Sequence, residues 1–386
     1  MTARGALRQQ DVVGFLDSLY QSDLHAKRIV SLANATIGVV KSASLAVHAI
    51  GQGLAHVQGT LPKHGVKQVD RLLSNCGIQV WAFFAYWVPH VVGARAKVVV
   101  ALDWTNFAAD GQDTIVLSML TRHGRATPLL WQTVWSDTLK GAQSEYEDAL
   151  LHRLREVLPE GVKVTVVADR GFADCKLLAY LAEELKFDYV IRLRGQYYIT
   201  DAAGERRKAA QWIGRGGRAR TLHDVILTDS QQYPAATVVC VQDQDMEEPW
   251  CLVSSEREVR ARTLIGYYAK RWGIETSFRD IKDLRFGMGL SSVRVSKPER
   301  RDRLLLLSAL AIALLSLLGA AGESLGYDRM LKANTVKTRT HSLFRQGLML
   351  YDAIPNMPEA RLRPLLDRFS GLLMQQRLFT ELFGHI

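Results

Sequence analysis

The sequence predicts an α/β protein in which a mixed β-sheet is flanked by helices. Two observations predict this class. Residues 97–193 alternate between short β-type runs and amphipathic helical segments, and residues 1–95 carry apolar residues at helical intervals. With 386 residues, of which 48% are hydrophobic and 23% charged, the chain is long enough for two or three domains that each have a core.

Residues 1–95 form the first predicted domain, a helical module. Helical periodicity is found in Asp11–Tyr20, Lys27–Val40, Ser42–Ala55 and Val66–Asn75, and the last segment continues through Trp81–Trp87. The region holds nine Lys and Arg against four Asp and Glu. Such a basic module suits a DNA-binding unit of the helix-turn-helix kind. A helical cap that packs on the core is the alternative.

Residues 96–325 form the second predicted domain. Its strands are expected at Val98–Asp103, Thr114–Thr121, Pro128–Trp135, Val164–Asp169 and Tyr189–Leu193, and its helices at Gln143–Val157 and Ala173–Leu185. Arg122–Ala126 is predicted to be a turn. This order of elements is that of an RNase H-like core, in which three meandering strands are followed by a helix, a strand, a helix and a strand. Because the first and fourth strands are neighbours in that fold, Asp103 and Asp169 are expected to meet at their carboxyl ends.

Residues 194–254 interrupt this alternation. They contain four short β-type runs separated by Gly-, Asp- and Gln-rich stretches, at Tyr197–Thr200, Val225–Thr228, Thr237–Val241 and Trp250–Ser254. The pattern predicts a β-rich insertion between the last core strand and the next helix.

That helix is predicted over Arg257–Asp283, and it carries Tyr268, Arg271, Glu275 and Lys282. Gaps of three, four and seven residues place these four side chains within an arc of roughly 60°. One carboxylate flanked by two cations suits a site that holds a metal ion and a phosphodiester. The alternative is a solvated helix face with weak, exposed ion pairs.

Two strand-end acids and one acid on a later helix are the minimum for a two-metal nuclease centre. The motif Tyr-x2-Arg-x3-Glu-x6-Lys, together with Asp103 and the Asp-Arg-Gly-Phe that begins at Asp169, resembles one group of transposases. These are the insertion-sequence DDE transposases with the Tyr-Arg-Glu-Lys signature, which move DNA by cut and paste. The resemblance runs from about residue 60 to about residue 350.

The resemblance implies roles for seven residues. Three would be catalytic metal ligands: Asp103, Asp169 and Glu275. Three would grip DNA near the cut site: Tyr268, Arg271 and Lys282. Trp250 has a place similar to that of a Trp which, in family members that form hairpin ends, stacks on a flipped base. A core role for Trp250 is the equal alternative.

Carboxylate ligands without a nearby thiol or imidazole indicate two Mg²⁺ ions, with Mn²⁺ as a substitute. The resemblance also implies double-stranded DNA partners, namely terminal inverted repeats and target DNA, and a homodimer that pairs two ends. It favours DNA binding as the role of the N-terminal module. Two other classes stay open: a non-catalytic DNA-binding protein derived from a transposase, and an RNase H-like nuclease that cuts without strand transfer.

The formal net charge of +10 favours a polyanionic partner, and basic residues cluster in segments 200–222 and 329–347. Four scattered cysteines, with no Cys-x-x-Cys pair, fit the reducing cytoplasm of a bacterial cell, where we expect the protein on the nucleoid. The uncharged segment Leu304–Gly322 approaches the length of a membrane span. A buried helix fits its Ala and Ser content better. Residues 326–386 are expected to be a helical tail that contacts DNA or a second protomer.

Overall fold

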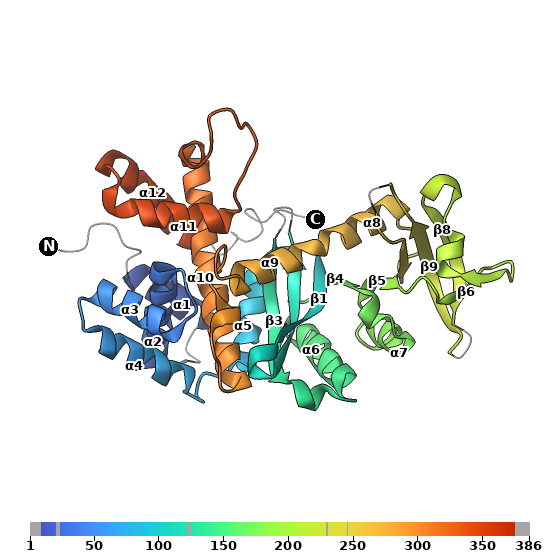
Figure 1. Cartoon of the computed structure of the whole chain (residues 1–386), viewed down its shortest axis with the longest axis horizontal. Helices are drawn as coiled ribbons and strands as arrows, with labels where there is room; N and C mark the ends of the chain where they lie inside the picture. Colours follow the sequence, from blue (N-terminus) through green and yellow to red (C-terminus); the bar gives the residue numbers. More distant parts are fainter. Residues whose placement is uncertain (1–8, 21–23, 122–124, 229–230, 245, 375–386) are drawn as a thin grey trace.

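The computed structural model describes residues 9–20, 24–121, 125–228, 231–244 and 246–374. The predicted turn Arg122–Ala126, the first eight residues of the helical module and the last twelve of the tail lie wholly or partly outside these ranges. Helices cover both faces of a central sheet, the N-terminal module lies at one end and the insertion at the other (Figure 1).

Among the described residues, ten strands form one mixed sheet in the order β3-β2-β1-β4-β5-β10-β9-β8-β6-β7. The core strands are β1 (Lys97–Phe107), β2 (Gln112–Leu120), β3 (Ala126–Trp135), β4 (Lys163–Ala168) and β5 (Asp188–Leu193). The first three form an antiparallel meander, and β4 is parallel to both β1 and β5. The predicted fold class and the predicted pairing of the first and fourth strands are confirmed.

Asp103 lies within β1 rather than at its end. The parallel ladder between β1 and β4 stops at the pair Leu102 and Ala168, and β1 then continues to Phe107 paired with β2 alone. The predicted strand end at Asp103 is wrong because β2 supplies backbone partners for the additional residues. Since Asp169 directly follows β4, both aspartates still lie one residue beyond the same rung of the ladder.

The insertion is β-rich, as predicted, and it extends the core sheet instead of forming a separate one. Its strands are β6 (Tyr198–Thr200), β7 (Arg206–Lys208), β8 (Arg220–Leu227), β9 (Tyr233–Val241) and β10 (Trp250–Ser254). β10 pairs antiparallel with β5, so the last strand of the insertion lies beside the last strand of the core. This pairing brings Trp250 close to the carboxyl ends of the parallel strands.

The N-terminal module consists of α1 (Gln9–Tyr20), α2 (Ala26–Ser42), α3 (Val47–Gln58), α4 (Pro62–Leu73) and α5 (Val80–Val92). The predicted helix Ser42–Ala55 begins later, because Ala43 ends α2 in the left-handed conformation (φ 47°). The predicted continuous segment from Val66 to Trp87 is two helices. Arg303 fixes the break by donating to Leu73 O and Ile78 O at 2.9 and 3.0 Å.

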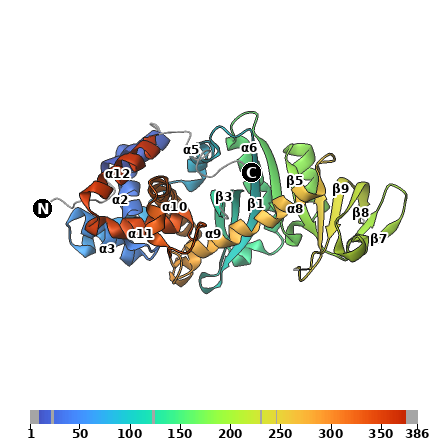
Figure 2. The same ribbon diagram turned by 90° about the horizontal axis from the view of Figure 1, so that it is seen from above.

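Helices lie on both faces of the core sheet. In Figure 1, α6 (Gln143–Val157) lies below the strands and α9 (Trp272–Lys282) above them. Figure 2 shows α8 (Ala261–Lys270) and α9 as a nearly straight rod that crosses the strands from the insertion toward α11. The helix predicted at Ala173–Leu185 is shorter, at α7 (Cys175–Ala179), and continues as one π-helical turn over Tyr180–Glu184.

The C-terminal part contains α10 (Pro298–Ser324), α11 (Leu343–Ala353) and α12 (Glu359–Met374). By length and composition, α10 is the one described single helix that could span a membrane, yet 94% of its apolar window is buried inside the protein, which fits the predicted buried helix. α10 and α11 cross closely at Gly319 and Gly347. A Cβ on either glycine would collide with a backbone oxygen of the other helix.

Candidate active site

The signature residues lie on two helices rather than one. The predicted helix Arg257–Asp283 is α8 and α9, joined by a tight turn at Arg271. Arg271 keeps helical dihedral angles (φ −53°, ψ −34°), and its N–H donates to Tyr268 O at 3.0 Å. The two helices therefore stay nearly collinear, and the four signature side chains stay on one side.

This side faces the sheet. Tyr268 is 1% exposed and Arg271 is 5% exposed, so the alternative of a solvated helix face is wrong for these two residues. Glu275 and Lys282 are half-buried. Ile274 and Ile281 are buried as well, so α9 is anchored by apolar packing.

Arg271 bridges two of the predicted catalytic acids. Its Nη1 lies 3.4 Å from Asp103 Oδ2, and its Nη2 lies 3.0 Å from Glu275 Oε1. The third acid is held by Tyr268, whose hydroxyl donates to Asp169 Oδ1 at 2.8 Å. Two residues of the signature therefore contact all three acids, which come from β1, from the residue after β4, and from α9.

The two aspartates have opposite pKa shifts. Burial raises the pKa of Asp103 to about 6, with Arg271 opposing the rise and the charges of Glu275 and Asp169 adding to it. Burial also acts to raise the pKa of Asp169. There the hydrogen bonds from Arg170 N and Tyr268, with nearby arginines, outweigh burial and lower the pKa. Negative charge is thus less favourable at Asp103 than at Asp169.

Lys282 shares a cavity with Glu275 without contacting it. Its Nζ donates to Thr105 Oγ1 at 3.0 Å and to Asn106 O at 2.8 Å, and burial lowers its pKa. The cavity has a volume of about 380 Å³ and is lined by Thr105, Glu275, Phe278, Arg279, Lys282, Asp283 and Ser291. Lys282 therefore lies along the edge of β1, two residues beyond Asp103.

Trp250 packs against Tyr268. The two rings meet edge to face, with centroids 4.8 Å apart and planes at 75°. Trp250 is half-buried, so it combines the core contact of one predicted role with the partial exposure that the other requires.

Two arginines and a glutamate at this site were missed by the sequence prediction. Arg192 on β5 lies 4.0 Å from Asp169 Oδ1 and pairs with Glu248 at 2.7 Å. Arg170 pairs with the same Glu248 at 2.8 Å. Two sequence features could have indicated these arginines: Arg170 directly follows the predicted acid Asp169, and Arg192 is the one charged residue among apolar residues at the end of β5. Those signals were present in the sequence, whereas the position of Glu248 depends on how the insertion folds.

Several residues of the predicted basic segments have partners within the protein. Lys332 pairs with Asp328 at 2.9 Å, and Arg339 pairs with Glu323. In the insertion, Arg207 and Arg220 lie over the ring of Trp212, at 5.1 and 4.9 Å. Part of each basic segment is therefore engaged within the protein.

The donor set fits a divalent metal ion in kind, since three carboxylates supply only hard oxygen ligands. Within the described part of the chain, however, no group of three His, Cys, Asp or Glu residues is arranged to hold an ion as it stands. The guanidinium of Arg271 lies between Asp103 and Glu275 and takes the place of a counter-ion. Arg271 therefore neutralises part of the negative charge of these two acids.

The sequence profile of the transposase DDE domain family matches residues 94–314, more than half of the chain. The chain belongs to this family. A search of curated proteins found no match. The matched region runs from just before β1 into α10, so the transposase domain includes all three acids and the insertion. Family membership implies DNA binding and nuclease and strand-transfer chemistry, and DDE transposases generally use divalent metal ions.

Proposed function

We propose that this transposase excises and reinserts an insertion-sequence element by cut and paste, as a member of the Tyr-Arg-Glu-Lys signature group. One observation carries the proposal: Arg271 and Tyr268, which belong to the signature, contact all three acids. Signature residues with only a structural role on a solvated helix face would not be expected to contact the three acids.

In this proposal Asp103, Asp169 and Glu275 hold two Mg²⁺ ions, for which Mn²⁺ can substitute. Metal ions at such sites activate water, neutralise charge on the phosphate and stabilise the leaving oxygen. Asp103, on which the charges of both other acids act, would be the ligand common to the two ions. Its raised pKa supports this assignment, because a buried carboxylate surrounded by other carboxylates is stabilised by added positive charge.

Arg271 holds the acids until DNA arrives. A guanidinium binds phosphate oxygens bidentately, so a DNA phosphate competes with Asp103 and Glu275 for Arg271. Its Nε is buried and has no hydrogen-bond partner in the described structure, which leaves one donor unused in the present arrangement. Turning toward the phosphate satisfies that donor and releases the two carboxylates.

The other signature residues would contact DNA on either side of Arg271. Lys282, held on the edge of β1, supplies a positive charge in the cavity that contains Glu275. Trp250 stacks on a flipped base in the proposed hairpin route, which allows one active site to cut both strands in sequence. Its edge contact with Tyr268 supports a coupled movement of these two rings.

The N-terminal module would read the terminal inverted repeats. Helices α3 and α4 are joined by the three residues Gly59–Leu61, and Gly59 takes a φ of +65°. This short turn is typical of a helix-turn-helix unit, in which the second helix enters the major groove. Lys63, Lys67 and Arg71 are exposed at spacings of four on α4, so they lie on one face that can approach phosphates or base edges. Two protomers, each with one active site, would pair the two ends.

Excision in bacterial cells tests the proposal. A plasmid carries the gene with its native flanks, and PCR across the donor site detects loss of the element. We expect an excision product from the wild type and none from Glu275→Gln. Purified protein and end DNA in Mn²⁺ then separate the alternatives. Binding without cleavage identifies a DNA-binding derivative, and cleavage without strand transfer identifies a nuclease.

A further inference from the structure

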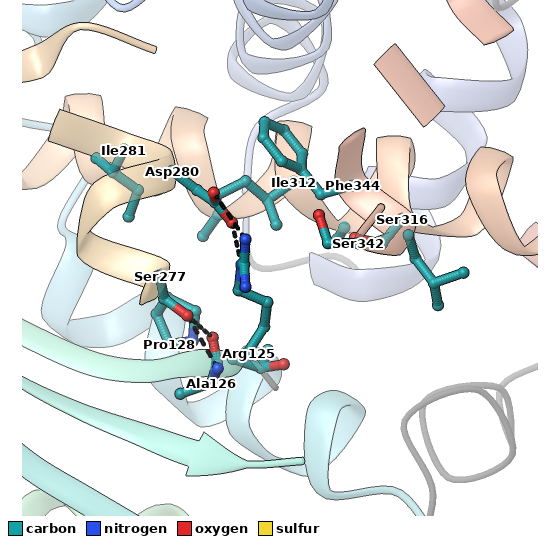
Figure 3. A pocket seen from close by; sticks show the side chains of 14 residues that line it. Arg125, Ala126, Pro128, Ser277, Asp280, Ile281, Ile312, Ser316, Ser342 and Phe344 are labelled. Carbon is teal, nitrogen blue, oxygen red and sulfur yellow. Dashed lines mark hydrogen bonds and ion pairs between the residues drawn. The ribbon is translucent and has the colours of Figure 1, made fainter. Parts of the chain in front are cut away.

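A basic groove lies between α9 and the start of α11, outside the acidic site. It has a volume of about 430 Å³ and is lined by Arg125, Arg279, Asp280, Phe286, Thr340, His341, Ser342, Phe344 and Arg345. Figure 3 shows a smaller neighbouring cavity, in which Arg125 reaches Asp280 on α9 between Ser277 and the side chains of Ser342 and Phe344. The groove is therefore built from the end of the transposase domain and the C-terminal region.

The charge of the groove is positive. Three guanidinium groups face one carboxylate, and Arg125 is paired with that carboxylate, Asp280, at 2.6 Å. Arg279 and Arg345 are exposed, and neither has an ion pair within the part of the chain that the structure describes. Two arginines thus remain for an external anion. Ser342 caps α11 by accepting from Arg345 N at 3.2 Å, which directs the positive end of this helix toward the same groove.

An exposed aromatic ring forms part of the wall. Phe286 is 58% exposed, in the loop that follows α9. Two hydrogen bonds fix the backbone of this loop: Asp283 Oδ1 accepts from Arg285 N at 2.8 Å and from Phe286 N at 2.6 Å. A fixed loop that holds an aromatic ring in water next to arginines is typical of surfaces that bind nucleic acid.

The groove adjoins the cavity of the acidic site at Arg279. Arg279 lines both the groove and the cavity that contains Glu275 and Lys282. It follows Glu275 by four residues, so the two side chains lie on one face of α9. A DNA strand that leaves the acids along α9 therefore meets Arg279 and then Arg345.

We infer that this groove binds target DNA during strand transfer, with Arg279 and Arg345 on its phosphates and Phe286 against a sugar or an unstacked base. The inference rests on the proposed transposase function. The target phosphate must reach the same acids as the end that was cut, so the target must continue past them. Trp250 and Tyr268, which are proposed to hold the cut end, lie toward the insertion, whereas the groove lies at the other end of α9, on the side of the N-terminal module. In the proposed pair of protomers, the N-terminal module would read the repeat of the end that is cut by the partner, which leaves the groove open to target DNA.

The test compares two reactions of the same purified protein. One is cleavage of a labelled transposon end, and the other is transfer of pre-cleaved ends into a supercoiled plasmid. We expect the Arg279→Ala, Arg345→Ala double variant to cleave ends within about twofold of the wild type but to transfer them at least tenfold more slowly. In a plot of the logarithm of the target-binding constant against the logarithm of salt concentration, the slope should become less steep by about two. Each lost phosphate contact reduces this slope by roughly one.

Three further variants make the outcome decisive. Arg279→Lys with Arg345→Lys keeps the charge and should restore most of the transfer. Phe286→Ala should slow transfer and leave cleavage unchanged. Arg155→Ala removes an exposed arginine from α6, below the sheet in Figure 1, and should change neither reaction. Equal loss of end binding or cleavage in the double variant would assign the groove to end DNA and overturn the inference, as would unchanged transfer. If the wild type cleaves no ends, the proposed function fails instead.

Discussion

The hydroxyl of Tyr268 donates a hydrogen bond to Asp169 across 99 positions of sequence, at 2.8 Å. This bond joins α8 to the residue that follows β4, and it contributes to the lowered pKa of Asp169. It also ties the position of an acid to the ring that contacts Trp250. The signature helix therefore organises the acids as well as carrying one of them.

Tyr268→Phe should reduce cleavage and lower stability by about 1 kcal/mol, because the half-buried carboxylate of Asp169 loses a hydrogen bond while the ring packing remains. Thermal unfolding and end cleavage measure the two effects. Tyr267→Phe is the matched control, since the neighbouring hydroxyl makes no hydrogen bond in the described structure. Equal behaviour of the two variants would show that the Asp169 contact is unimportant.

Asp103→Asn, Asp169→Asn and Glu275→Gln should each abolish cleavage and leave end binding intact, because the amides keep the shape of the side chains but are poor ligands for a divalent ion. Gel shift and cleavage assays on one preparation check both properties. Asp137→Asn changes an acid whose side chain is 98% exposed and should behave as the wild type. Loss of binding in all three variants would point to a structural role for the acids.

Arg271→Gln should bind Mn²⁺ more tightly than the wild type when DNA is absent, because Arg271 competes with the ion for Asp103 and Glu275. If the contacts of Arg271 with the two acids oppose Mn²⁺ binding by about 1.4 kcal/mol, removing them should tighten Mn²⁺ binding about tenfold. Calorimetric titration measures this change, and cleavage of DNA should fall in the same variant. Arg155→Gln, a change at an exposed arginine on α6, serves as the control. Unchanged or weaker Mn²⁺ binding would contradict the role of Arg271 as a counter-ion.

Trp250→Ala should slow hairpin formation more than the first nick, because only the second step uses a flipped base. A time course with both species resolved on a denaturing gel gives the two rates. Trp135→Ala provides a control from the far side of the core sheet, where the ring is 43% exposed. Equal slowing of both steps would indicate that Trp250 only packs against Tyr268.

Glu147→Gln should raise the melting temperature above that of the wild type at pH 8, with the difference shrinking as the pH falls toward 4.5. Glu147 is 7% exposed, and burial raises its pKa although Trp104 Nε1 and Gln143 Nε2 both donate to it, at 2.9 and 2.8 Å. Because the folded-state pKa is raised, the stability that Glu147 contributes is fully present only below its unfolded pKa and is lost as the pH rises. Glutamine keeps both hydrogen bonds without the charge.

Glu145→Gln is the control for this pH dependence, since Glu145 is exposed on the same helix. Thermal unfolding at several pH values compares the two variants. A stability difference for Glu147→Gln that does not vary with pH would contradict the assignment to a buried charge.

The order of the core strands and helices along the chain, and the nature of the three acids, could be predicted because they depend on local features. Nearly continuous apolar runs mark β1 and β4, and the signature spacing marks one helical face. Boundaries were less predictable. β1 extends past Asp103 because β2 provides a partner strand, and α2 ends at Ala43 because the chain turns there, neither of which the apolar pattern records.

The sequence by itself determined the residue types of the site, the order of the elements along the chain and the family. These three properties depend on local sequence patterns and on the spacing of motif residues. Only the tertiary structure decided which charges meet. Arg271 could have paired with Glu275 alone, but the packing of α9 on the sheet places it between Glu275 and Asp103. The same packing brings Arg345 of α11 beside Arg279 of α9. Such contacts join residues far apart in the chain, and they depend on how whole helices and strands bury their apolar faces.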